Sequence, residues 1–254
     1  MKIALLGYGK MGRFIHRLAA EAGDEVVLTV DVDQRPGLTA ADLRGADVII
    51  EFTRPDAAVA NIDLALAAGV PIVVGTTGWL NELPAVSDRV AAAGGGLFWA
   101  SNFSIGVNVF FAAAQRLAEL MDGKPEYAAR ITEIHHTQKL DAPSGTGITL
   151  AERAAAGLSD YDSWKLAGVQ SPAPVTAIAP ASAPANGKMA VPIHSVREEG
   201  VPGTHELTFT SPVDTLRIEH VAHSREGFAR GALTAARWMV GRQGTFTMTD
   251  LLAE

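Results

Sequence analysis

Residues 133–146, with the sequence E-I-H-H-T-Q-K-L-D-A-P-S-G-T, gather side chains that can move protons beside a fixed positive charge. His135 and His136 can exchange protons near neutral pH, because the imidazole of histidine titrates in that range. Lys139 follows in the same run and can either donate a proton or attract an anion. The segment therefore predicts acid–base chemistry on a negatively charged substrate.

The end of the same segment has the features of a carboxylate-binding site. Ser144 is placed to cap a helix that begins near Gly145. The backbone amides of Gly145 and Thr146 then lie at the helix N-terminus, where unpaired amides and the helix dipole attract anions. The hydroxyl groups of Ser144 and Thr146 add donors, and Lys139 adds charge. This arrangement favours a small anionic substrate, and a dicarboxylate fits it well.

Simpler interpretations of these residues stay open. Neighbouring residues of a strand point to opposite faces, so one of His135 and His136 can be a core residue. A Ser-Gly-Thr run before a helix is often only a cap. A zinc site is a weaker alternative, because Asp141 alone joins the two histidines. Serine-nucleophile catalysis at Ser144 is also weak, since no G-x-S-x-G turn surrounds it. We therefore predict no metal site.

The N-terminal glycine motif indicates the cofactor. A G-x-G-x-x-G run lies between a predicted strand, residues 2–6, and a predicted helix, residues 10–21, which is the context of dinucleotide-binding turns. Asp31 ends the next predicted strand and is placed to bind ribose hydroxyls, which favours NADH. Arg35 follows closely and can offset the repulsion of a 2′-phosphate, so NADPH stays open. The residues of the motif are Gly7, Tyr8, Gly9, Lys10, Met11 and Gly12.

Two further loops follow predicted strands, at the edge where parallel sheets bind their ligands. Small and polar side chains there can contact the ribose or the nicotinamide of a dinucleotide. Composition alone makes ordinary turns an equally good interpretation of each loop. The residues concerned are Gly75, Thr76 and Thr77 in the first loop, and Ser101, Asn102 and Phe103 in the second.

Hydrophobic periodicity divides the chain into two halves. Strands at residues 2–6, 25–31, 47–52, 71–74 and 97–100 alternate with helices at 10–21, 57–68 and 81–93, which predicts a doubly wound parallel sheet. Before the second of these helices, Thr53 is a candidate N-cap and Pro55 suits the first helical position. Later helices at 108–120, 145–156 and 225–240, with strands at 128–136, 189–196, 204–210 and 215–222, predict an α+β half with a mixed or antiparallel sheet. The Pro- and Ala-rich residues 171–187 predict a loop.

Composition excludes several classes of function. The chain has 254 residues, of which 48% are hydrophobic, a net charge of −7 and no cysteine. Nucleic-acid binders need a basic face, and disulfides or thiolate sites need cysteine. No segment approaches the roughly 20 apolar residues of a membrane span. We therefore expect a cytoplasmic protein with a packed core and without a nucleic-acid or membrane partner.

The chain is similar to the 4-hydroxy-tetrahydrodipicolinate reductase (dihydrodipicolinate reductase) family of the diaminopimelate route to lysine. The long and specific run H-H-x-x-K-x-D-A-P-S-G-T carries this resemblance, with the glycine loop and the runs D-V-I-I-E-F-T-R-P, V-V-G-T-T-G, S-N-F-S-I-G-V-N and S-R-E-G-F-A-R-G-A-L. It implies a Rossmann-type dinucleotide-binding domain at residues 1–105 and 225–254, to which the last helix returns. A second α+β domain at residues 106–224 would bind substrate and form a homotetramer.

The resemblance also implies a role for each site residue. His135 and Lys139 are the expected proton donors, His136 binds substrate, and Gly145 and Thr146 bind a substrate carboxylate. NADH or NADPH is expected to contact residues 7–12, Asp31, residues 75–77 and residues 100–103, of which the last range begins with Ala100. Many members have a glycine loop of the form G-A-x-G-x-M-G, whereas this chain has G-Y-G-K-M-G. That departure bears on the pyrophosphate contact and on coenzyme preference.

Two rivals share part of this pattern. A two-domain dehydrogenase of amino or imino acids, such as aspartate or diaminopimelate dehydrogenase, has a similar first half. It has no reason to carry the H-H-x-x-K-x-D-A-P-S-G-T run. A nucleotide-sensing protein without catalysis needs the glycine loop but not the histidines and lysine.

Overall fold

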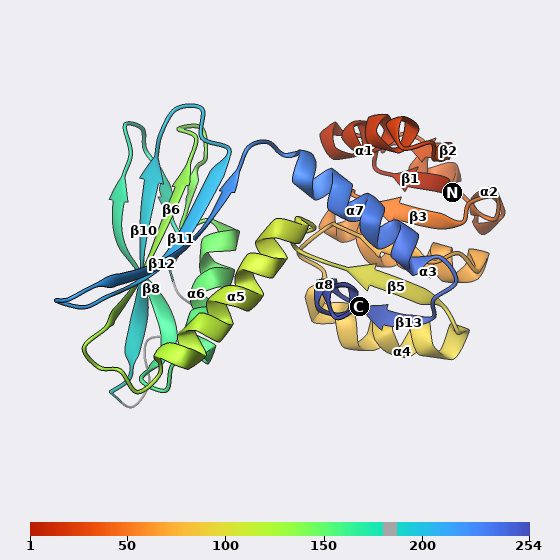
Figure 1. Ribbon diagram of the computed structural model, residues 1–254. Helices are drawn as coiled ribbons and strands as arrows, with labels where there is room; N and C mark the ends of the chain where they lie inside the picture. The colour runs from red at the N-terminus through yellow and green to blue at the C-terminus, as the bar shows by residue number, and fades with distance from the viewer. Residues whose placement is uncertain (180–186) are drawn as a thin grey trace. The chain divides into compact units, whose positions relative to one another are not determined.

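The protein consists of two compact units in a computed structural model that describes residues 1–179 and 187–254. The first unit is formed by Met1–Ile105 and Glu226–Glu254, and the second by Gly106–Arg225. Figure 1 shows that each unit has its own sheet with helices packed against it. Among the described residues, no helix is both long and apolar enough to cross a membrane.

The first unit contains a parallel sheet, as the sequence predicts. In the described residues its strand order is β13-β5-β4-β3-β1-β2, and every neighbouring pair is parallel. The strands are β1 (Lys2–Leu6), β2 (Glu25–Val30), β3 (Val48–Glu51), β4 (Ile72–Val74), β5 (Gly96–Trp99) and β13 (Gly244–Phe246). The chain runs outward from β1 in both directions, so the switch point lies between β1 and β3. Ligands of doubly wound sheets bind beyond the strand ends at such a point.

Helices cover both faces of this sheet, which explains why its strands are continuous apolar runs. Alternate residues of the strands enter two separate cores, one with α1 and α7 and the other with α3 and α4. The helices of the unit are α1 (Lys10–Glu21), α2 (Ala40–Leu43), α3 (Pro55–Ala68), α4 (Leu83–Ala93), α7 (Glu226–Met239) and α8 (Met248–Leu252), with short 3₁₀ turns at η1 (Arg35–Gly37) and η2 (Leu80–Glu82).

The start of α3 differs from the prediction in one respect. Pro55 is the first helical residue, as expected, but the N-cap is Arg54 and not Thr53. The hydroxyl of Thr53 instead donates to Glu51, and its backbone amide donates to Oγ1 of Thr76 at 2.8 Å. Thr53 therefore joins the ends of β3 and β4 and does not cap the helix.

The second unit contains a mixed sheet with the strand order β12-β11-β6-β10-β8. Neighbours among β6, β10 and β8 are parallel, whereas β11 runs antiparallel to both β6 and β12. Two helices, α5 (Ile105–Met121) and α6 (Gly145–Ala156), contribute to one apolar core with this sheet. The strands are β6 (Ala128–His135), β8 (Tyr161–Gln170), β10 (Met189–Arg197), β11 (Gly203–Thr210) and β12 (Thr215–Ala222). We did not predict β8, β13, α2 or α8.

The Pro- and Ala-rich segment is not a loop throughout. Its residues Thr176–Ala177 form a short strand, β9, which pairs in parallel with β7 (Asp141–Ala142). The amide of Thr176 donates to the carbonyl of Leu140 at 2.5 Å, and the amide of Ile178 donates to the carbonyl of Ala142 at 2.6 Å. The prediction of a loop is therefore wrong at these two residues, and for residues 180–186 it lies outside the described part of the chain.

The close approach of α7 to the first unit's core makes one glycine essential. A Cβ atom on Gly231 would lie 1.7 Å from the carbonyl oxygen of Phe103, whereas one on Gly227 of the same helix would meet Oγ of Ser104 at an ordinary 3.5 Å. We expect Gly231→Ala to reduce the free energy of unfolding by about 1–3 kcal/mol despite the better helix propensity of alanine. Thermal denaturation followed by circular dichroism checks this, with Gly227→Ala as the control. Equal melting temperatures for the two variants would contradict it.

Candidate active site

The glycine loop after β1 brings the start of α1 to the edge of the parallel sheet. Gly7 has a φ of +93°, and a Cβ atom there would lie 2.0 Å from the carbonyl oxygen of Phe52. A Cβ atom on Gly12 would lie 2.1 Å from the carbonyl oxygen of Gly7. In contrast, a Cβ atom on Gly9, the N-cap of α1, would meet nothing within 4 Å. The first and third glycines are needed for packing, and the second leaves open space over the backbone for a ligand.

A cavity of about 640 Å³ lies at this edge, at the switch point between β1 and β3. It is lined by residues that follow β1, β2 and β3, so it brings Gly7, Gly9 and Asp31 together as the motif predicts. The carboxylate of Asp31 is exposed and accepts the backbone amide of Val32 at 2.8 Å. Four other lining residues were not among the predicted nucleotide contacts, and these are Phe52, Thr53, Arg54 and Asn61. The position of the first three directly after β3 is the signal that could have identified them.

A buried polar network lies beneath the cavity. Glu51, at the end of β3, has no exposed surface, and burial raises the pKa of its carboxyl group although Thr53, Thr76 and Asn61 donate hydrogen bonds to it. Asn61 also accepts a hydrogen bond from Nε of Arg35 at 2.5 Å. The network therefore connects the side chain of Arg35, at one end of the cavity, with the loop that follows β4.

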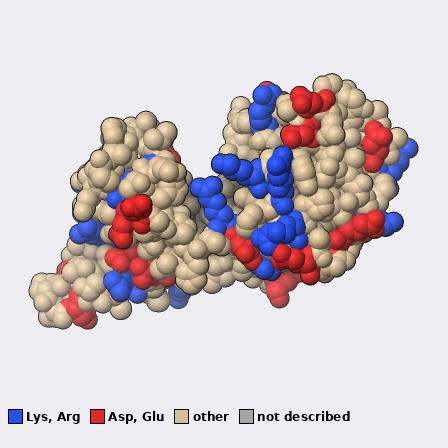
Figure 2. Space-filling model, turned by 90° about the horizontal axis from the view of Figure 1, so that it is seen from above, with Lys and Arg blue, Asp and Glu red and all other residues tan. Residues whose placement is uncertain are grey.

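The other residues predicted to bind a nucleotide are placed less directly. The hydroxyl of Tyr8 forms a hydrogen bond with Nδ1 of His16 at 2.7 Å. Figure 2 shows basic side chains gathered on the face of this unit that is seen from above. Thr76 is buried, and its Oγ1 accepts a hydrogen bond from the backbone amide of Thr53. Phe103 is also buried, with its ring 5.7 Å from that of Phe52, so its side chain belongs to the core. The remaining members, Lys10, Met11, Gly75, Thr77, Ala100, Ser101 and Asn102, lie at strand ends or in the first turn of α1 but do not line the cavity.

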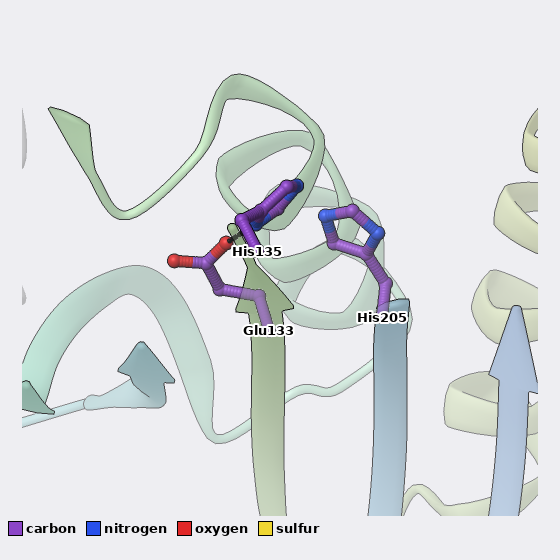
Figure 3. A group of neighbouring side chains, drawn as sticks. All are labelled: Glu133, His135 and His205. Atoms are coloured by element: carbon purple, nitrogen blue, oxygen red, sulfur yellow. Dashed lines mark ion pairs between the residues drawn. The ribbon is translucent and has the colours of Figure 1, made fainter. Parts of the chain in front are cut away.

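In the second unit, strand register assembles a cluster around His135. Glu133 lies two residues earlier on β6 and therefore on the same face. His205 of β11 stands opposite Glu133, and Arg197 of β10 stands opposite His135. Nδ1 of His135 contacts Oε2 of Glu133, as Figure 3 shows, and the ring of His205 meets that of His135 edge-on at 5.0 Å between centroids. On the other side, Nη1 of Arg197 lies 3.0 Å from Oε1 of Glu133.

These contacts set the charges of the cluster. Burial alone would raise the pKa of Glu133, but its contacts with His135 and Ser195 and the charge of Arg197 outweigh burial and lower that pKa to about 2. Burial lowers the pKa of His205 to about 3, and the neighbouring His135 adds to the shift. At neutral pH the cluster therefore holds an ionised carboxylate, a guanidinium and one neutral imidazole.

His136 and Lys139 lie in the turn that follows the strand. The strand ends at His135, one residue earlier than predicted, and the carbonyl of His136 accepts the amide of Lys139 at 3.0 Å. Nζ of Lys139 donates to both carboxylate oxygens of Asp141, at 2.8 and 2.7 Å. Burial lowers the pKa of His136, and the next largest cause is the charge of Arg225. The surroundings of His136 are therefore cationic, which suits an anionic ligand.

Ser144 is the N-cap of α6, as predicted. Its hydroxyl accepts the amide of Gly147 at 3.0 Å and lies 3.1 Å from Nε2 of His205. The side chain is buried, whereas Gly145 is exposed and Thr146 is partly exposed. Ser144 therefore connects the helix to the histidine cluster, and the backbone at Gly145 and Thr146 is the part of the helix start that faces solvent.

The cluster also has the donor set of a transition-metal site. One ligand atom each from Glu133, His135 and His205 lies within 4.8 Å of the other two. The guanidinium of Arg197, however, already supplies the positive charge beside Glu133. His205 also has a hydrogen-bond partner in Ser144. The geometry therefore favours a hydrogen-bonded cluster for proton transfer and not a metal centre.

The neutral state of buried His205 predicts an acid dependence of stability. Because the folded-state pKa, about 3, lies below the ordinary value of 6.5, its contribution to stability is complete above pH 6.5 and declines as pH falls toward 3. The lowered pKa of Glu133 also makes the protein less stable in acid, but only below pH 4.5, which is the ordinary pKa of a glutamate. Between pH 6.5 and 4.5, His205→Gln should reduce the slope of unfolding free energy against pH by about 1.4 kcal/mol per pH unit. Urea unfolding across that window checks this, and an unchanged slope would contradict it.

Comparisons with known proteins cover both units. Residues 1–103 match the family model described as dihydrodipicolinate reductase, N-terminus, and residues 106–252 match the one described as dihydrodipicolinate reductase, C-terminus. A 4-hydroxy-tetrahydrodipicolinate reductase of Christiangramia forsetii is 40% identical over 100% of this chain and 98% of its own. One of Nitratidesulfovibrio vulgaris is 35% identical over 96% of each chain.

Solved structures agree with the fold. A dihydrodipicolinate reductase from Paenisporosarcina, solved with dipicolinate bound, has a TM-score of 0.74 and 23% identity over 99% of both chains. An amine dehydrogenase from Mycobacterium smegmatis has a TM-score of 0.60 and 13% identity over 98% of this chain and 95% of its own. At these identities the likeness shows a shared architecture and nothing more specific.

Proposed function

The chain belongs to the dihydrodipicolinate reductase family, and from this premise we propose that it reduces 4-hydroxy-tetrahydrodipicolinate to tetrahydrodipicolinate with NADH or NADPH, in lysine biosynthesis through diaminopimelate. The observation that carries the proposal is the arrangement of residues 133–146. His135 is held by a buried carboxylate, Lys139 lies in the next turn, and a helix N-terminus follows at Gly145. Neither rival function needs this arrangement.

We propose that the first unit binds the coenzyme. The cavity at the switch point fits a dinucleotide, because Gly9 leaves its backbone uncovered at the start of α1 and Asp31 is exposed at the ribose end. The loops at residues 75–77 and 100–103 would complete the contacts. A bound nicotinamide coenzyme supplies a hydride. Asp31 and Arg35 both line the cavity, so the site has a group for the ribose hydroxyls and a group for a 2′-phosphate.

The second unit would bind the dicarboxylate substrate. Lys139, Arg225 and Arg197 all lower the pKa of His136, which indicates a positive potential around that side chain. One carboxylate would lie at the N-terminus of α6 on Gly145 and Thr146, and the other near His136 and Lys139. The binding of dipicolinate to the relative from Paenisporosarcina, as its structure is described, supports a ligand of this shape. Ser144, which is buried, would act by holding the helix start in place.

His135 would supply the proton. Loss of the 4-hydroxyl group as water would leave an unsaturated imine ring. Once a hydride has been added at C4 of that ring, the resulting enamine must be protonated. A general acid positioned beside the ring accelerates such a step by on the order of 10²–10⁴-fold. Lys139 would bind a carboxylate and take part in proton transfer, and its ion pair with Asp141 must loosen or be shared when substrate binds.

The open face of the mixed sheet supports self-association, and the family resemblance implies a homotetramer. Helices α5 and α6 cover one face, and register aligns Val221, Thr204, Ile134 and Val196 in a row across the other. Val221 is 49% exposed. A sheet buries an apolar face against another layer, and a second copy of the same sheet would supply that layer. We place the tetramer in the cytoplasm, where a biosynthetic reductase meets its coenzyme pool.

An assay of coenzyme oxidation tests the function. The purified protein should consume NADH or NADPH when hydroxytetrahydrodipicolinate is generated in the cuvette, and should not do so without it. Protein that binds nucleotide but oxidises neither coenzyme would be the nucleotide-sensing rival. Turnover of amino acids in place of the ring substrate would identify an amino-acid dehydrogenase.

Replacement of His135 separates proton transfer from binding. His135→Ala should lower kcat by on the order of 10²–10⁴-fold, since the general acid is lost, while nucleotide affinity stays the same because the coenzyme cavity lies in the first unit. Steady-state kinetics and a fluorescence titration of coenzyme measure the two quantities. Arg116→Ala is the control, because Arg116 is an exposed residue of α5 in the same unit and belongs to none of the groups assigned to the site. An unaltered kcat in His135→Ala would remove this residue from the chemistry.

A further inference from the structure

Arg197 is a buried side chain with several polar contacts near the site. Its side chain has no exposed surface, and its guanidinium contacts four groups. Nη1 forms the ion pair with Glu133 and donates to the carbonyl of Val196 at 2.7 Å. Nε donates to the carbonyl of Lys139 at 3.2 Å, and Nη2 donates to the carbonyl of Asp141 at 2.6 Å. One planar group therefore contacts two separate segments of the chain.

Those two segments carry the two groups to which we assign proton transfer. Glu133 contacts Nδ1 of His135, so Arg197 reaches this histidine through one carboxylate. The carbonyl groups of Lys139 and Asp141 belong to the turn that presents the lysine. The guanidinium fork is suited to such a bridge, because its donors have fixed directions, whereas a lysine ammonium has one flexible centre.

The ring of His135 is confined on the remaining sides. His205 meets it edge-on, with 5.0 Å between centroids, and is itself bonded to Ser144. A Cβ atom on Gly203 would lie 3.1 Å from Nε2 of His135, so the absence of a side chain there leaves room beside that nitrogen. With Nδ1 directed at Glu133, Nε2 is the nitrogen left for a substrate.

Stability alone is a poor explanation for this arrangement. Removing a carboxylate and a guanidinium from water is costly, and apolar residues of similar volume often stabilise a fold as well or better. A buried carboxylate that accepts a hydrogen bond from one ring N–H of histidine fixes the tautomer and the orientation of the ring.

We propose that Glu133 and Arg197 are positioning residues of the reaction, an inference that rests on the proposed function. Glu133 selects the tautomer of His135 with the proton on Nδ1, and Arg197 fixes both Glu133 and the turn that carries Lys139. Neither residue touches substrate. Together they set the distance and orientation between the two proton donors.

The tautomer can be measured without turnover. In protein labelled with ¹⁵N-histidine, the nitrogen shifts of neutral His135 should report a proton on Nδ1 in the wild type, and a mixture of tautomers in Glu133→Gln. A wild-type spectrum with the proton on Nε2 would overturn the proposal even if no variant folds. Because this readout is independent of catalysis, it also distinguishes a wrong proposal about Glu133 from a wrong reaction.

Kinetics then test the consequence. Glu133→Gln should lower kcat by on the order of 100-fold with a smaller change in KM for the ring substrate, and should shift the pH at which kcat is half-maximal. Arg197→Lys, which retains the charge but loses the fork, should lower kcat and also raise KM, because the turn of Lys139 loosens. The exposed ion pair of Arg116 and Glu119 on α5 of the same unit provides the matched controls Arg116→Lys and Glu119→Gln, which should leave both constants unchanged. Folded Glu133→Gln protein with wild-type kcat and pH profile would overturn the proposal.

Discussion

The buried ion pair between Arg197 and Glu133 is the interaction on which the second unit's site depends. It forms because β10, β6 and β11 are aligned so that Arg197 stands opposite His135, and His205 stands opposite Glu133. Loss of one partner would leave the other charge buried and uncompensated, which typically costs about 3–5 kcal/mol. The pair therefore constrains the sheet register, and that register places His135 at the end of its strand beside the turn of Lys139.

Each unit contains a buried glutamate, and the pKa values of the two carboxyl groups are shifted in opposite directions. Glu133 is ionised because the positive charge of Arg197 and the contact from His135 outweigh the effect of burial on its pKa. Glu51 has only neutral donors around it, and burial raises its pKa. The raised pKa of Glu51 opposes a negative charge beneath the cavity that we propose for the dinucleotide, whereas the ionised carboxylate of Glu133 contacts Nδ1 of His135.

Local patterns were sufficient to predict the parts of the site that depend on neighbouring residues. The glycine loop, the strand before it and the helix after it are local, and so are the cap at Ser144 and the extent of α6. His205 and Arg197 could not be predicted, because they reach His135 only through pairing between strands that lie far apart in the sequence. The prediction of the N-cap of α3 failed for a similar reason, since Thr53 bonds to Thr76 in the loop after β4 and the cap is Arg54. Cross-strand register is a tertiary property, and periodicity contains no information about it.

The central claim is that a hydride passes from a nicotinamide coenzyme to a ring carbon while this chain's own side chains supply the proton. Mass spectrometry of the product tests it most directly, after turnover with NADH or NADPH that carries deuterium at the transferred position of the nicotinamide. We predict tetrahydrodipicolinate that has gained a single deuterium, at C4 of the ring. Product formed without deuterium, or deuterium lost to water before the product appears, would contradict the account.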